Sequence, residues 1–384
     1  MKKVISIVLN NFKNDSRVLK ENLSLQRAGY DVKVIALHDG SLLKEFDDIQ
    51  GITIHRVRLK SKNWSKNKII QLFKYVEYIY KVIKQYGYYC DIVHCNDLNT
   101  LPIGVIVKKI YNKDVKIVYD AHEHETERIQ VKGFIKRLTK ILEKKCIKYA
   151  DRVITVSDSI ADEYVKLYKI NKPVVVLNAP PFIEFTNKTD IFREVFNITK
   201  EQMIFLYQGM LNRGRGIEII LDAFKKLSNK THVLNGKVVI VFMGLGELED
   251  FIQKTAQKYD NIYFHPAVLP NVILNYTNSA DVGISMIEDI SLSYKYCLPN
   301  KLFEYVMAEL PVIVSNLYEM KKLVIQNKIG CMSKENTSES LISAINEIIN
   351  MNFQELKNNT KNFKTIYNWE EQEKILLNVY KKLE

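Results

Sequence analysis

The stretch PNKLFEYVMAELPVIVS, residues 299–315, has the pattern of a helix followed directly by a strand. After Asn300, apolar residues recur every three or four positions, which is the period of an amphipathic helix. The closing segment, PVIVS, is a continuous apolar run, typical of a strand buried on both faces of a parallel sheet. Lys301 and Glu304 stand on one face of the helix, near its start. The stretch predicts a helix–strand unit of an α/β fold and leaves the role of the two charges to be explained.

The same alternation of strands and helices runs through nearly the whole chain. A linker is indicated at 178–190, NAPPFIEFTNKTD, where two prolines are followed by polar residues. We therefore expect an α/β protein with two parallel-sheet halves joined near residue 180. Short apolar segments predict strands at 3–10, 31–37, 91–95, 115–121, 152–157, 173–178, 203–209, 238–244, 262–266, 281–287 and 311–315.

Length and composition agree with two large domains. The chain has 384 residues, of which 47% are hydrophobic, and this is ample material for two cores. No apolar run reaches the roughly 18 residues that span a bilayer. The first residues turn polar too early for a secretory signal, so we expect a cytoplasmic protein. The five cysteines have neither zinc-site nor disulfide spacing, which favours reduced, mostly buried thiols.

The chain is basic, with a formal net charge of +12. Such a charge favours anionic partners such as nucleotide phosphates, anionic lipid or nucleic acid, but no nucleic-acid recognition motif accompanies it, so no nucleic acid is expected. Basic residues gather in segments 60–89 and 128–152, and the second segment carries nine basic and two acidic residues. Both segments have helical spacing of apolar residues. They are either ordinary amphipathic helices with solvated basic faces or a surface that lies against an anionic membrane, at its inner face.

The loops that follow strands are the expected ligand-binding segments, because open α/β sheets bind ligands beyond the carboxyl ends of their strands. Strand 203–209 is followed by MLNRGRGIE. Here Gly209, Gly214 and Gly216 permit a close backbone approach. Arg213 and Arg215 stand just before a helix. Small residues, a helix N-terminus and guanidinium groups together favour a diphosphate site, with a plain turn as the alternative.

The next loop and the opening stretch extend this interpretation. Gly244 and Gly246 again admit a close ligand, although a tight strand-to-helix turn explains them equally well. If the arginines hold phosphates, Glu304 is well placed to accept hydrogen bonds from the vicinal hydroxyls of a ribose. Lys301 would then meet a phosphate or pair with Glu304. The alternative is an exposed i,i+3 salt bridge, which we consider less suited to charges that precede a central strand.

Six segments together resemble the retaining glycosyltransferases of family four, over nearly the whole chain. This resemblance implies the GT-B fold, in which two Rossmann-like parallel-sheet domains face across a cleft. It implies an acceptor-binding domain at 1–180, a nucleotide-sugar donor domain at 195–367, and a final helix, 368–384, that crosses back to the first domain. It implies no metal and no cofactor. The segments are DSRVLKENLSLQRAGYDVKVIAL, DIVHCND, YDAHEHE, ADRVITVSDSIADEY, YQGMLNRGRGIEIILDAF and LPNKLFEYVMAELPVIVS.

The resemblance also implies residues that bind the donor. Arg215 matches the family's basic residue before the glycine that opens the first donor-domain helix. Met210 stands where the family usually has an arginine, so Arg213 would substitute for it. Of the family's two glutamates eight residues apart, Tyr296 replaces the first and Glu304 matches the second, which leaves the donor sugar open. The expected donor-binding residues are Gly209, Arg213, Arg215, Gly244, Gly246, His265, Asn300, Lys301, Leu302 and Glu304.

In the first domain, the segment YDAHEHE, 119–125, ends a strand. His122 resembles the family histidine near the reaction centre, where a neutral imidazole would hydrogen-bond a sugar hydroxyl; a lone histidine at a strand end is more often structural. The first loop, NNFKNDSR, lacks the family's glycine pair. The expected acceptor-binding residues are Asn11, Asp15, Arg17, Asp97, His122 and Glu123, and the expected catalytic residues are His122, Arg215 and Glu304.

The expected activity is that of a retaining, metal-independent hexosyltransferase. It would move a sugar from a nucleoside diphosphate, with a UDP-sugar as the expected donor, to a glycan or lipid-linked acceptor in cell-surface polysaccharide biosynthesis. Arginines, Lys301 and helix N-termini would stabilise the leaving diphosphate. The alternatives are a nucleotide-sugar epimerase or phosphorylase of the same fold, and a non-catalytic scaffold that binds sugar nucleotides. The loss of an acid at Tyr296 gives the scaffold some weight.

Overall fold

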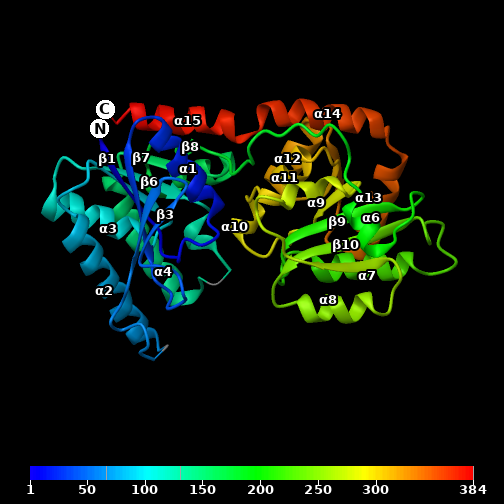
Figure 1. Ribbon diagram of the computed structural model, residues 1–384, viewed down its shortest axis with the longest axis horizontal. Helices are drawn as coiled ribbons and strands as arrows, with labels where there is room; N and C mark the ends of the chain where they lie inside the picture. The colour runs from blue at the N-terminus through cyan, green and yellow to red at the C-terminus, as the bar shows by residue number, and fades with distance from the viewer. Residues whose placement is uncertain (66, 130, 384) are drawn as a thin grey trace. The chain divides into compact units, whose positions relative to one another are not determined.

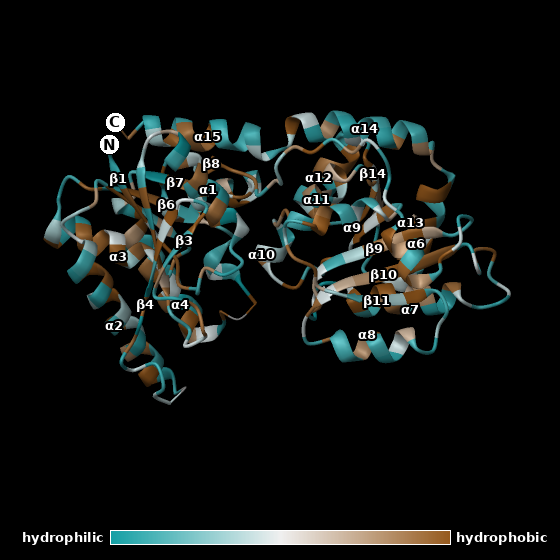
Figure 2. Ribbon diagram, viewed as in Figure 1, coloured by the Kyte–Doolittle hydropathy of each residue, from teal (hydrophilic) through white to brown (hydrophobic). Residues whose placement is uncertain are grey.

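The computed structural model describes residues 1–65, 67–129 and 131–383, and the chain divides into two compact units. Unit 1 comprises Met1–Val176 together with Glu373–Glu384, and unit 2 comprises Leu177–Gln372. Each unit is a sheet covered by helices (Figure 1). Hydrophobic residues are concentrated along most strands, as expected for sheets with helices on their faces (Figure 2).

Unit 1 contains an eight-stranded sheet over its described residues, in the order β3-β4-β2-β1-β5-β6-β7-β8. All neighbouring strands are parallel except β3 and β4, which are antiparallel. The strands are β1 (Lys3–Ile7), β2 (Asp31–Leu37), β3 (Phe46–Ile49), β4 (Ile52–Val57), β5 (Ile92–Asn96), β6 (Lys116–Ala121), β7 (Arg152–Thr155) and β8 (Val174–Val175). The helices are α1 (Ser16–Arg27), α2 (Lys68–Tyr86), α3 (Leu101–Ile106), α4 (Gly133–Cys146) and α5 (Asp158–Tyr168), with short helices η1 (Val107–Tyr111), η2 (Glu125–Glu127) and η3 (Ile147–Tyr149).

Unit 2 contains a six-stranded, all-parallel sheet over its described residues, in the order β11-β10-β9-β12-β13-β14. The strands are β9 (Met203–Met210), β10 (Val238–Leu245), β11 (Ile262–Pro266), β12 (Val282–Ser285), β13 (Val312–Ser315) and β14 (Gly330–Ser333). The helices are α6 (Ile191–Phe196), α7 (Ile217–Leu227), α8 (Glu249–Ala256), α9 (Ile273–Asn278), α10 (Leu292–Lys295), α11 (Asn300–Met307), α12 (Tyr318–Gln326), α13 (Ser338–Asn350) and α14 (Phe353–Ile366), and the last helix of the chain is α15 (Trp369–Lys381).

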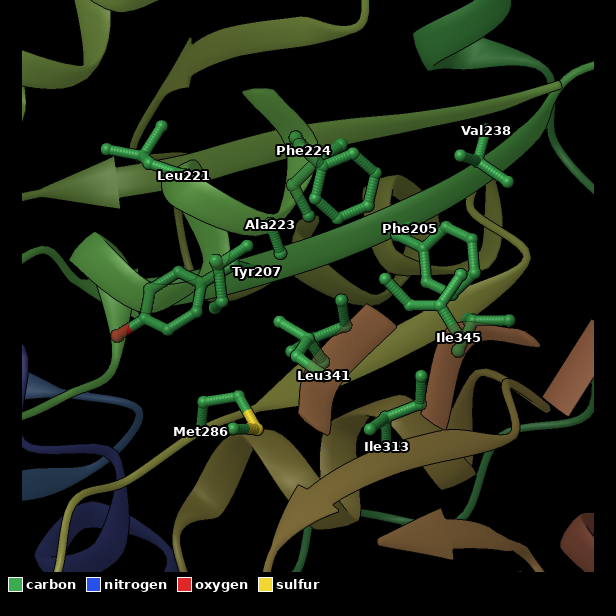
Figure 3. Close-up of a cluster of buried hydrophobic side chains, with 14 of the residues drawn as sticks. Phe205, Tyr207, Leu221, Ala223, Phe224, Val238, Met286, Ile313, Leu341 and Ile345 are labelled. Atoms are coloured by element: carbon green, nitrogen blue, oxygen red, sulfur yellow. The ribbon is translucent and has the colours of Figure 1, made fainter. Parts of the chain in front are cut away.

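In the core of unit 2, the central strand β9 has side chains on both faces of the sheet, and helices cover each face. Phe205 and Tyr207 of β9 pack with Leu221 and Phe224 of α7 and with Leu341 of α13 (Figure 3). Because side chains alternate along a strand, the residues between them face the other layer. The sheet is therefore covered by α7 and α13 on one face, which leaves the other face of β9 to helices such as α11.

The strand order of each sheet reverses at one point. In unit 1 the reversal lies between β1 and β5, and in unit 2 it lies between β9 and β12. Connections leave such neighbouring strands in opposite directions, which opens a crevice at their carboxyl ends where ligands of doubly wound sheets bind. These two strand pairs define where a functional site is expected in each unit.

All eleven predicted strands are present, so the predicted α/β class is confirmed. Three further strands, β3, β4 and β14, were missed. The first contains two aspartates and forms the exposed edge of its sheet, while β4 alternates apolar and polar residues instead of forming an apolar run. Strand β14, GCMS, is too short to show any period.

Helix α11 begins at Asn300, as the opening stretch predicts, and the face that carries Lys301 is covered as well as the apolar face. Lys301 and Tyr305 are 8% and 0% exposed, and Ala308, just after the helix, is 1% exposed. The helix contacts α9, α14, β12 and β13, so neighbours cover it on nearly every side. Only tertiary packing decides this, because the sequence period shows one apolar stripe and cannot reveal a second covering layer.

The thiols and the helices agree with two simpler expectations. None of the five cysteines forms a disulfide, and all but Cys297 are buried. Among the helices that the structure describes, none combines the length and the apolar character needed to cross a membrane.

Candidate functional site

Gly209 marks an open position at the carboxyl end of β9, beside the reversal point of the sheet in unit 2. Its φ is +112°, a conformation that a residue with a side chain rarely adopts. A Cβ atom placed there would contact only the side chain of Lys301, at 3.7 Å from Cε. Gly209 is exposed, so a ligand can reach the backbone at this point.

Gly244 and Gly246 are required by close packing of the backbone, whereas the sequence suggested that they admit a ligand. A Cβ atom on Gly244 would collide with the carbonyl oxygen of Gly209 on the adjacent strand. One on Gly246 would lie 2.6 Å from the carbonyl oxygen of Leu211 and from Oδ1 of Asn212. The prediction that these two glycines admit a ligand is corrected, because neighbouring backbone already fills the space.

Arg215 is held in place by an aromatic ring, whereas Arg213 is exposed. The guanidinium carbon of Arg215 lies 4.9 Å from the ring centroid of Tyr294, which belongs to α10. Such a contact orients a guanidinium without using its N–H donors. The backbone N–H of Arg213 donates to Oε1 of Glu247 at 2.9 Å, so the turn is also fixed from the β10–α8 loop. Arg215 can therefore present its donors to an anion.

Lys301 is a buried lysine at the edge of this site. Its Nζ lies 3.5 Å from the ring centroid of Tyr207, and the residue is 8% exposed. Burial, and secondly the positive charge of Arg215, hold the pKa of Lys301 well below its usual range, while Glu304 acts in the opposite direction. Two basic groups held close together would both be stabilised by an anion such as a diphosphate.

Glu304 is oriented by a side chain that the sequence analysis missed. Gln208, which is fully buried, donates from Nε2 to Oε2 of Glu304 at 2.5 Å. The Gln208 amide is fixed in turn, since its Oε1 accepts from Oγ1 of Thr277 at 2.7 Å and its backbone N–H donates to the hydroxyl of Tyr305 at 2.9 Å. Glu304 itself is half-buried. A polar residue inside the apolar run MIFLYQG was the available signal.

The other predicted donor-binding residues lie apart from this centre or are used by the fold. Asn300 is exposed at the start of α11. Leu302 is buried, and its N–H donates to the carbonyl of Pro299 at 3.0 Å, so it is not available to a phosphate. His265 stands on the edge strand β11, with Nδ1 2.7 Å from the carbonyl oxygen of Pro266 and its ring 5.0 Å from that of Tyr276. Leu302 is therefore a structural residue here, which corrects its prediction, while the predicted roles of Asn300 and His265 stay predictions.

In unit 1, Asp97 and His122 come together at the carboxyl ends of β5 and β6. The Nδ1 atom of His122 lies 3.5 Å from Oδ1 of Asp97, and its Nε2 lies 3.3 Å from Oδ2 of Asp120. The backbone N–H of His122 also donates to Asp97, at 3.3 Å. The side chains of His122 and Asp97 are 20% and 34% exposed, so both are accessible to a ligand.

The charge of His122 differs from the expected one. Burial acts to lower the pKa of His122, but the carboxylates of Asp97 and Asp120 outweigh it and raise the pKa to about 10. At neutral pH the ring is therefore an imidazolium with two N–H donors, and the expectation of a neutral imidazole is corrected. Such a group can donate hydrogen bonds to a sugar or phosphate oxygen and supplies a positive charge.

Arg17, predicted to bind an acceptor, is instead part of the interior. It is 4% exposed, and its Nη2 donates to both carboxylate oxygens of Asp120 at 3.0 Å. Its Nε lies 3.0 Å from Oε1 of Glu21, and its Nη1 donates to the carbonyl of Val176 at 3.0 Å. These contacts use the donors of the guanidinium, which corrects the acceptor-binding prediction. The role of Arg17 is to fix Asp120 beneath His122.

Glu21, Asp120 and His122 offer ligand atoms within 4.8 Å of one another, which is close enough for a metal ion. The guanidinium of Arg17 already lies 3.0 Å from each of the two carboxylates. A fixed positive charge therefore occupies the place that a cation would need, and this donor set does not fit one. Arg17 holds the pKa of Asp120 well below its usual range, against burial, while burial raises the pKa of Glu21 to about 8.

The remaining predicted acceptor residues divide into two kinds. Asp15 caps α1 by accepting from the N–H of Val18 at 3.2 Å. Asn11 donates from Nδ2 to Asp39 at 2.6 Å, so both residues hold the β1–α1 loop in shape. Glu123, whose side chain is 39% exposed, pairs with Arg128 at 3.2 Å and stays accessible next to His122.

Comparison with known proteins matches the chain to glycosyltransferases in both halves. The family model for Glycosyltransferase Family 4 matches residues 23–179, and that for Glycosyl transferases group 1 matches residues 188–365. An uncharacterized glycosyltransferase of Methanocaldococcus jannaschii is 23% identical over 377 residues, which are 93% of this chain and 91% of that protein.

Solved structures show the fold. Sucrose-phosphate synthase of Thermosynechococcus elongatus has a TM-score of 0.78 at 17% identity, and covers 100% of this chain and 99% of its own. The HepE protein of Anabaena, in complex with UDP and glucose, has a TM-score of 0.73 at 14% identity and the same coverage. From its two family matches and its fold, the chain belongs to glycosyltransferase family four and has the GT-B fold.

Proposed function

We propose that the protein is a retaining hexosyltransferase that takes a sugar from a nucleoside diphosphate, with UDP as the nucleotide, and attaches it to a glycan or lipid-linked acceptor. The observation that carries the proposal is the arrangement around Gly209 in unit 2. An open glycine, an oriented guanidinium, a buried lysine and an oriented carboxylate lie at the reversal point of a doubly wound sheet. The likeness to a protein solved with UDP and glucose supports UDP as the nucleotide.

Each group of this arrangement has a task that matches part of the donor. Arg215 and Lys301 would bind the diphosphate, and Glu304 would accept hydrogen bonds from the ribose hydroxyls. The bond between the anomeric carbon and the diphosphate oxygen breaks as the acceptor oxygen bonds to the same face of that carbon. The acceptor's proton passes to the departing diphosphate oxygen, so no protein nucleophile and no metal is required. The two basic groups stabilise the negative charge that grows on the leaving diphosphate.

Unit 1 would bind the acceptor through the residues at the carboxyl ends of β5 and β6. Imidazolium His122 can donate to an acceptor or sugar oxygen, and Asp97 can accept from a hydroxyl. Glu123 adds a second exposed carboxylate. This set suits a hydroxyl-rich acceptor.

Contact with an anionic membrane is proposed from the surfaces of α2 and α4. Both helices expose large apolar side chains at helical spacing, and apolar residues recur along both (Figure 2). On α4, Phe134 and Leu138 are 72% and 50% exposed, and Arg137, Lys144 and Lys145 lie on the same helix. An exposed apolar face flanked by basic residues is the pattern of a helix that lies in a membrane interface. Such a location suits the synthesis of cell-surface polysaccharides on lipid carriers.

The membrane contact has a direct test. Co-sedimentation with vesicles should require anionic lipid and weaken as salt shortens the screening length from about 10 Å at 0.1 M to about 3 Å at 1 M. Reversing the charge of Arg137, Lys144 and Lys145 should abolish it. Lys136 and Lys140 are unsuitable for this purpose, because both bind Glu127 at 2.6 Å. Binding that ignores salt and charge reversal would refute the membrane contact.

The donor proposal is tested by a thermal-shift panel of UDP-, GDP-, ADP- and dTDP-sugars. A ligand at 100 times its dissociation constant should stabilise the protein by about 2.7 kcal/mol, and the UDP-sugars should give the largest shift. Turnover without an acceptor, or dependence on inorganic phosphate, would favour an epimerase or a phosphorylase. No shift with any sugar nucleotide would refute the donor site.

A further inference from the structure

Unit 1 has a pocket of about 730 Å³ that the proposed function does not explain. It lies between the start of α2 and the ends of β1, β2 and β4, on the same edge of the sheet as Asp97. Leucines form one side and α2 forms the other. The side chains that bear on the argument are Leu9, Leu37, Leu59, Trp64, Tyr75 and Tyr78.

The aromatic side of the pocket is rigid and apolar. The hydroxyl of Tyr78 donates to the carbonyl oxygen of Val8 at 2.9 Å, and that of Tyr75 donates to the carbonyl oxygen of Asn99 at 2.7 Å. Because both hydroxyls are used by the backbone, the half-buried ring of Tyr75 offers mainly apolar surface to the pocket, and the fully buried ring of Tyr78 supports it from behind. Together with the three leucines, they make a lining that favours a hydrocarbon over a chain of hydroxyl groups.

The loop that carries Trp64 is tied to α2 by two side chains of that helix. Glu77 accepts from the backbone N–H groups of Lys60 and Ser61, at 2.6 and 3.0 Å. Lys74 donates from Nζ to the carbonyl of Trp64 at 3.0 Å. Against the effect of burial, the hydrogen bonds from Ser61 and Lys60 lower the pKa of Glu77 to about 2, so this tie persists at any ordinary pH. The pocket is therefore formed before any ligand arrives.

The rim adds positive charge and an exposed aromatic ring. Lys62 and Lys74 line the pocket, and none of its lining residues is acidic. Trp64 is 55% exposed although its loop is fixed, so its indole is available to a ligand. An apolar interior with ammonium groups at its rim matches a molecule that joins a hydrocarbon chain to an anionic head.

The opposite face of α2 points to the same ligand class. Five large apolar side chains on it are 53% to 66% exposed. They are Ile69, Leu72, Phe73, Val76 and Tyr80. Their spacing of three or four residues places them on one stripe, away from the pocket residues Gln71, Lys74, Tyr75 and Tyr78 of the same helix. A helix whose outward stripe is apolar and exposed fits a lipid environment better than water.

We propose that this pocket binds the hydrocarbon segment next to the phosphate of a lipid phosphate, which carries the acceptor. This inference rests on the proposed function in that it names the acceptor class of the same transferase. Lys62 at the rim would contact the phosphate, while Lys74, whose Nζ already donates to the carbonyls of Lys62 and Trp64, would add its positive charge. The indole of Trp64 would cover the first part of the chain. The ligand's attached hydroxyl-bearing portion would extend toward Asp97, along the shared edge of the sheet.

Trp64 makes the binding measurable, because the chain has only two tryptophans and the other, Trp369, is buried. Farnesyl phosphate, added below the concentration at which it aggregates, should shift the emission to shorter wavelength in a saturable way. The Trp64→Phe variant should lose this shift. Inorganic phosphate and methyl glucoside should cause none. An absent or unsaturable shift with farnesyl phosphate, or an equal response to methyl glucoside, would overturn the proposal.

A matched pair of variants tests the location. Gln71 lines the pocket and is exposed, so Gln71→Phe fills the mouth without disturbing the core and should weaken farnesyl phosphate binding by about tenfold or more. Gln85→Phe, at an exposed position of α2 outside the pocket lining, should leave binding unchanged. Equal effects of the two variants would overturn the location.

Calorimetry with UDP separates this inference from the donor proposal. Gln71→Phe should bind UDP as the wild type does, because UDP is assigned to unit 2. If the wild type binds farnesyl phosphate but not UDP or any sugar nucleotide, the proposed transferase activity fails while the pocket assignment stands. If it binds UDP but not farnesyl phosphate, the donor proposal stands and the lipid-phosphate inference fails.

Discussion

Replacing Glu304 by Gln is the most direct test of the donor site, because the substitution preserves shape and removes only the charge. Gln208 donates to Oε2 of Glu304 at 2.5 Å, and the oxygen of the new amide can still accept this bond. The fold should therefore persist. The bond from Gln208 loses its charge assistance, a cost of about 1 kcal/mol, which lowers Tm by about 2–4 °C in a domain of this size.

The effect on the donor should be larger than the effect on stability. A hydrogen bond to a charged group contributes about 1.5–3 kcal/mol and a neutral one about 0.5–1.5 kcal/mol, so each of two ribose bonds weakens by about 1–1.5 kcal/mol. The sum, about 2–3 kcal/mol, corresponds to a loss of about 30- to 150-fold in affinity. Calorimetry with UDP and kcat/KM for the donor should both show it.

A second carboxylate provides the control. Glu309 lies just after α11 and pairs with Lys364 at 2.7 Å, with its side chain 17% exposed. Glu309→Gln should lower Tm and leave UDP affinity unchanged. Wild-type UDP affinity and kcat/KM in folded Glu304→Gln would refute the reasoning, and a lowered Tm with that result would leave Glu304 with a structural role only.

Three further predictions concern the basic groups. Arg215→Ala should lower both kcat and donor affinity, because the negative charge that Arg215 faces on the diphosphate grows in the transition state. Replacing the exposed Arg213 should have a smaller effect on both. A change in KM alone in Arg215→Ala would contradict this placement. Because burial, and secondly the charge of Arg215, hold the pKa of Lys301 well below its usual range, a bound diphosphate should raise that pKa and make UDP affinity depend on pH. Calorimetry with UDP over a pH series should show this dependence in the wild type and lose it in Lys301→Met, and the same dependence in both proteins would argue against the placement of Lys301. His122 has its pKa raised from 6.5 to about 10, so its contribution to stability is complete below pH 6.5 and is lost as the pH rises through about 10. Urea unfolding should show the gap between wild type and His122→Gln narrowing over that range, and a constant gap would disprove the assigned charge.

Much of the fold could be read from the sequence because its signals are local. Continuous apolar runs such as VVIVFMG are strands since a parallel sheet covered on both faces leaves no strand face for water. Proline and polar residues at 178–190 predict a linker for an equally local reason, whereas the structure divides the chain between Val176 and Leu177. The strands that were not predicted are β3, β4 and β14. They lie on or next to a sheet edge, or are too short to show the hydrophobic period of a strand.

Part of the candidate site could also be predicted from local sequence. Gly209, Arg215 and Glu304 follow directly from residue type and position at strand or helix ends, and the structure brings them into one region. Sequence reasoning could not separate Gly209, which is open to a ligand, from Gly244, where a Cβ atom would meet the adjacent strand. Both are glycines after apolar runs, and only the neighbouring strand distinguishes them.

Burial and charge state were decided by tertiary structure alone. Arg17 and Asp120 are 103 residues apart in sequence, yet their contact removes the arginine from the surface and fixes the acid beneath His122. Gln208 and Glu304 are 96 residues apart, and no local pattern joins them. A pKa depends on the solvent and charges within a few ångströms, and the chain brings these together only when it folds. The sequence by itself therefore determines the α/β class and those strands that are continuous apolar runs, while the packing of distant segments decides which side chains keep their charge and can meet a ligand.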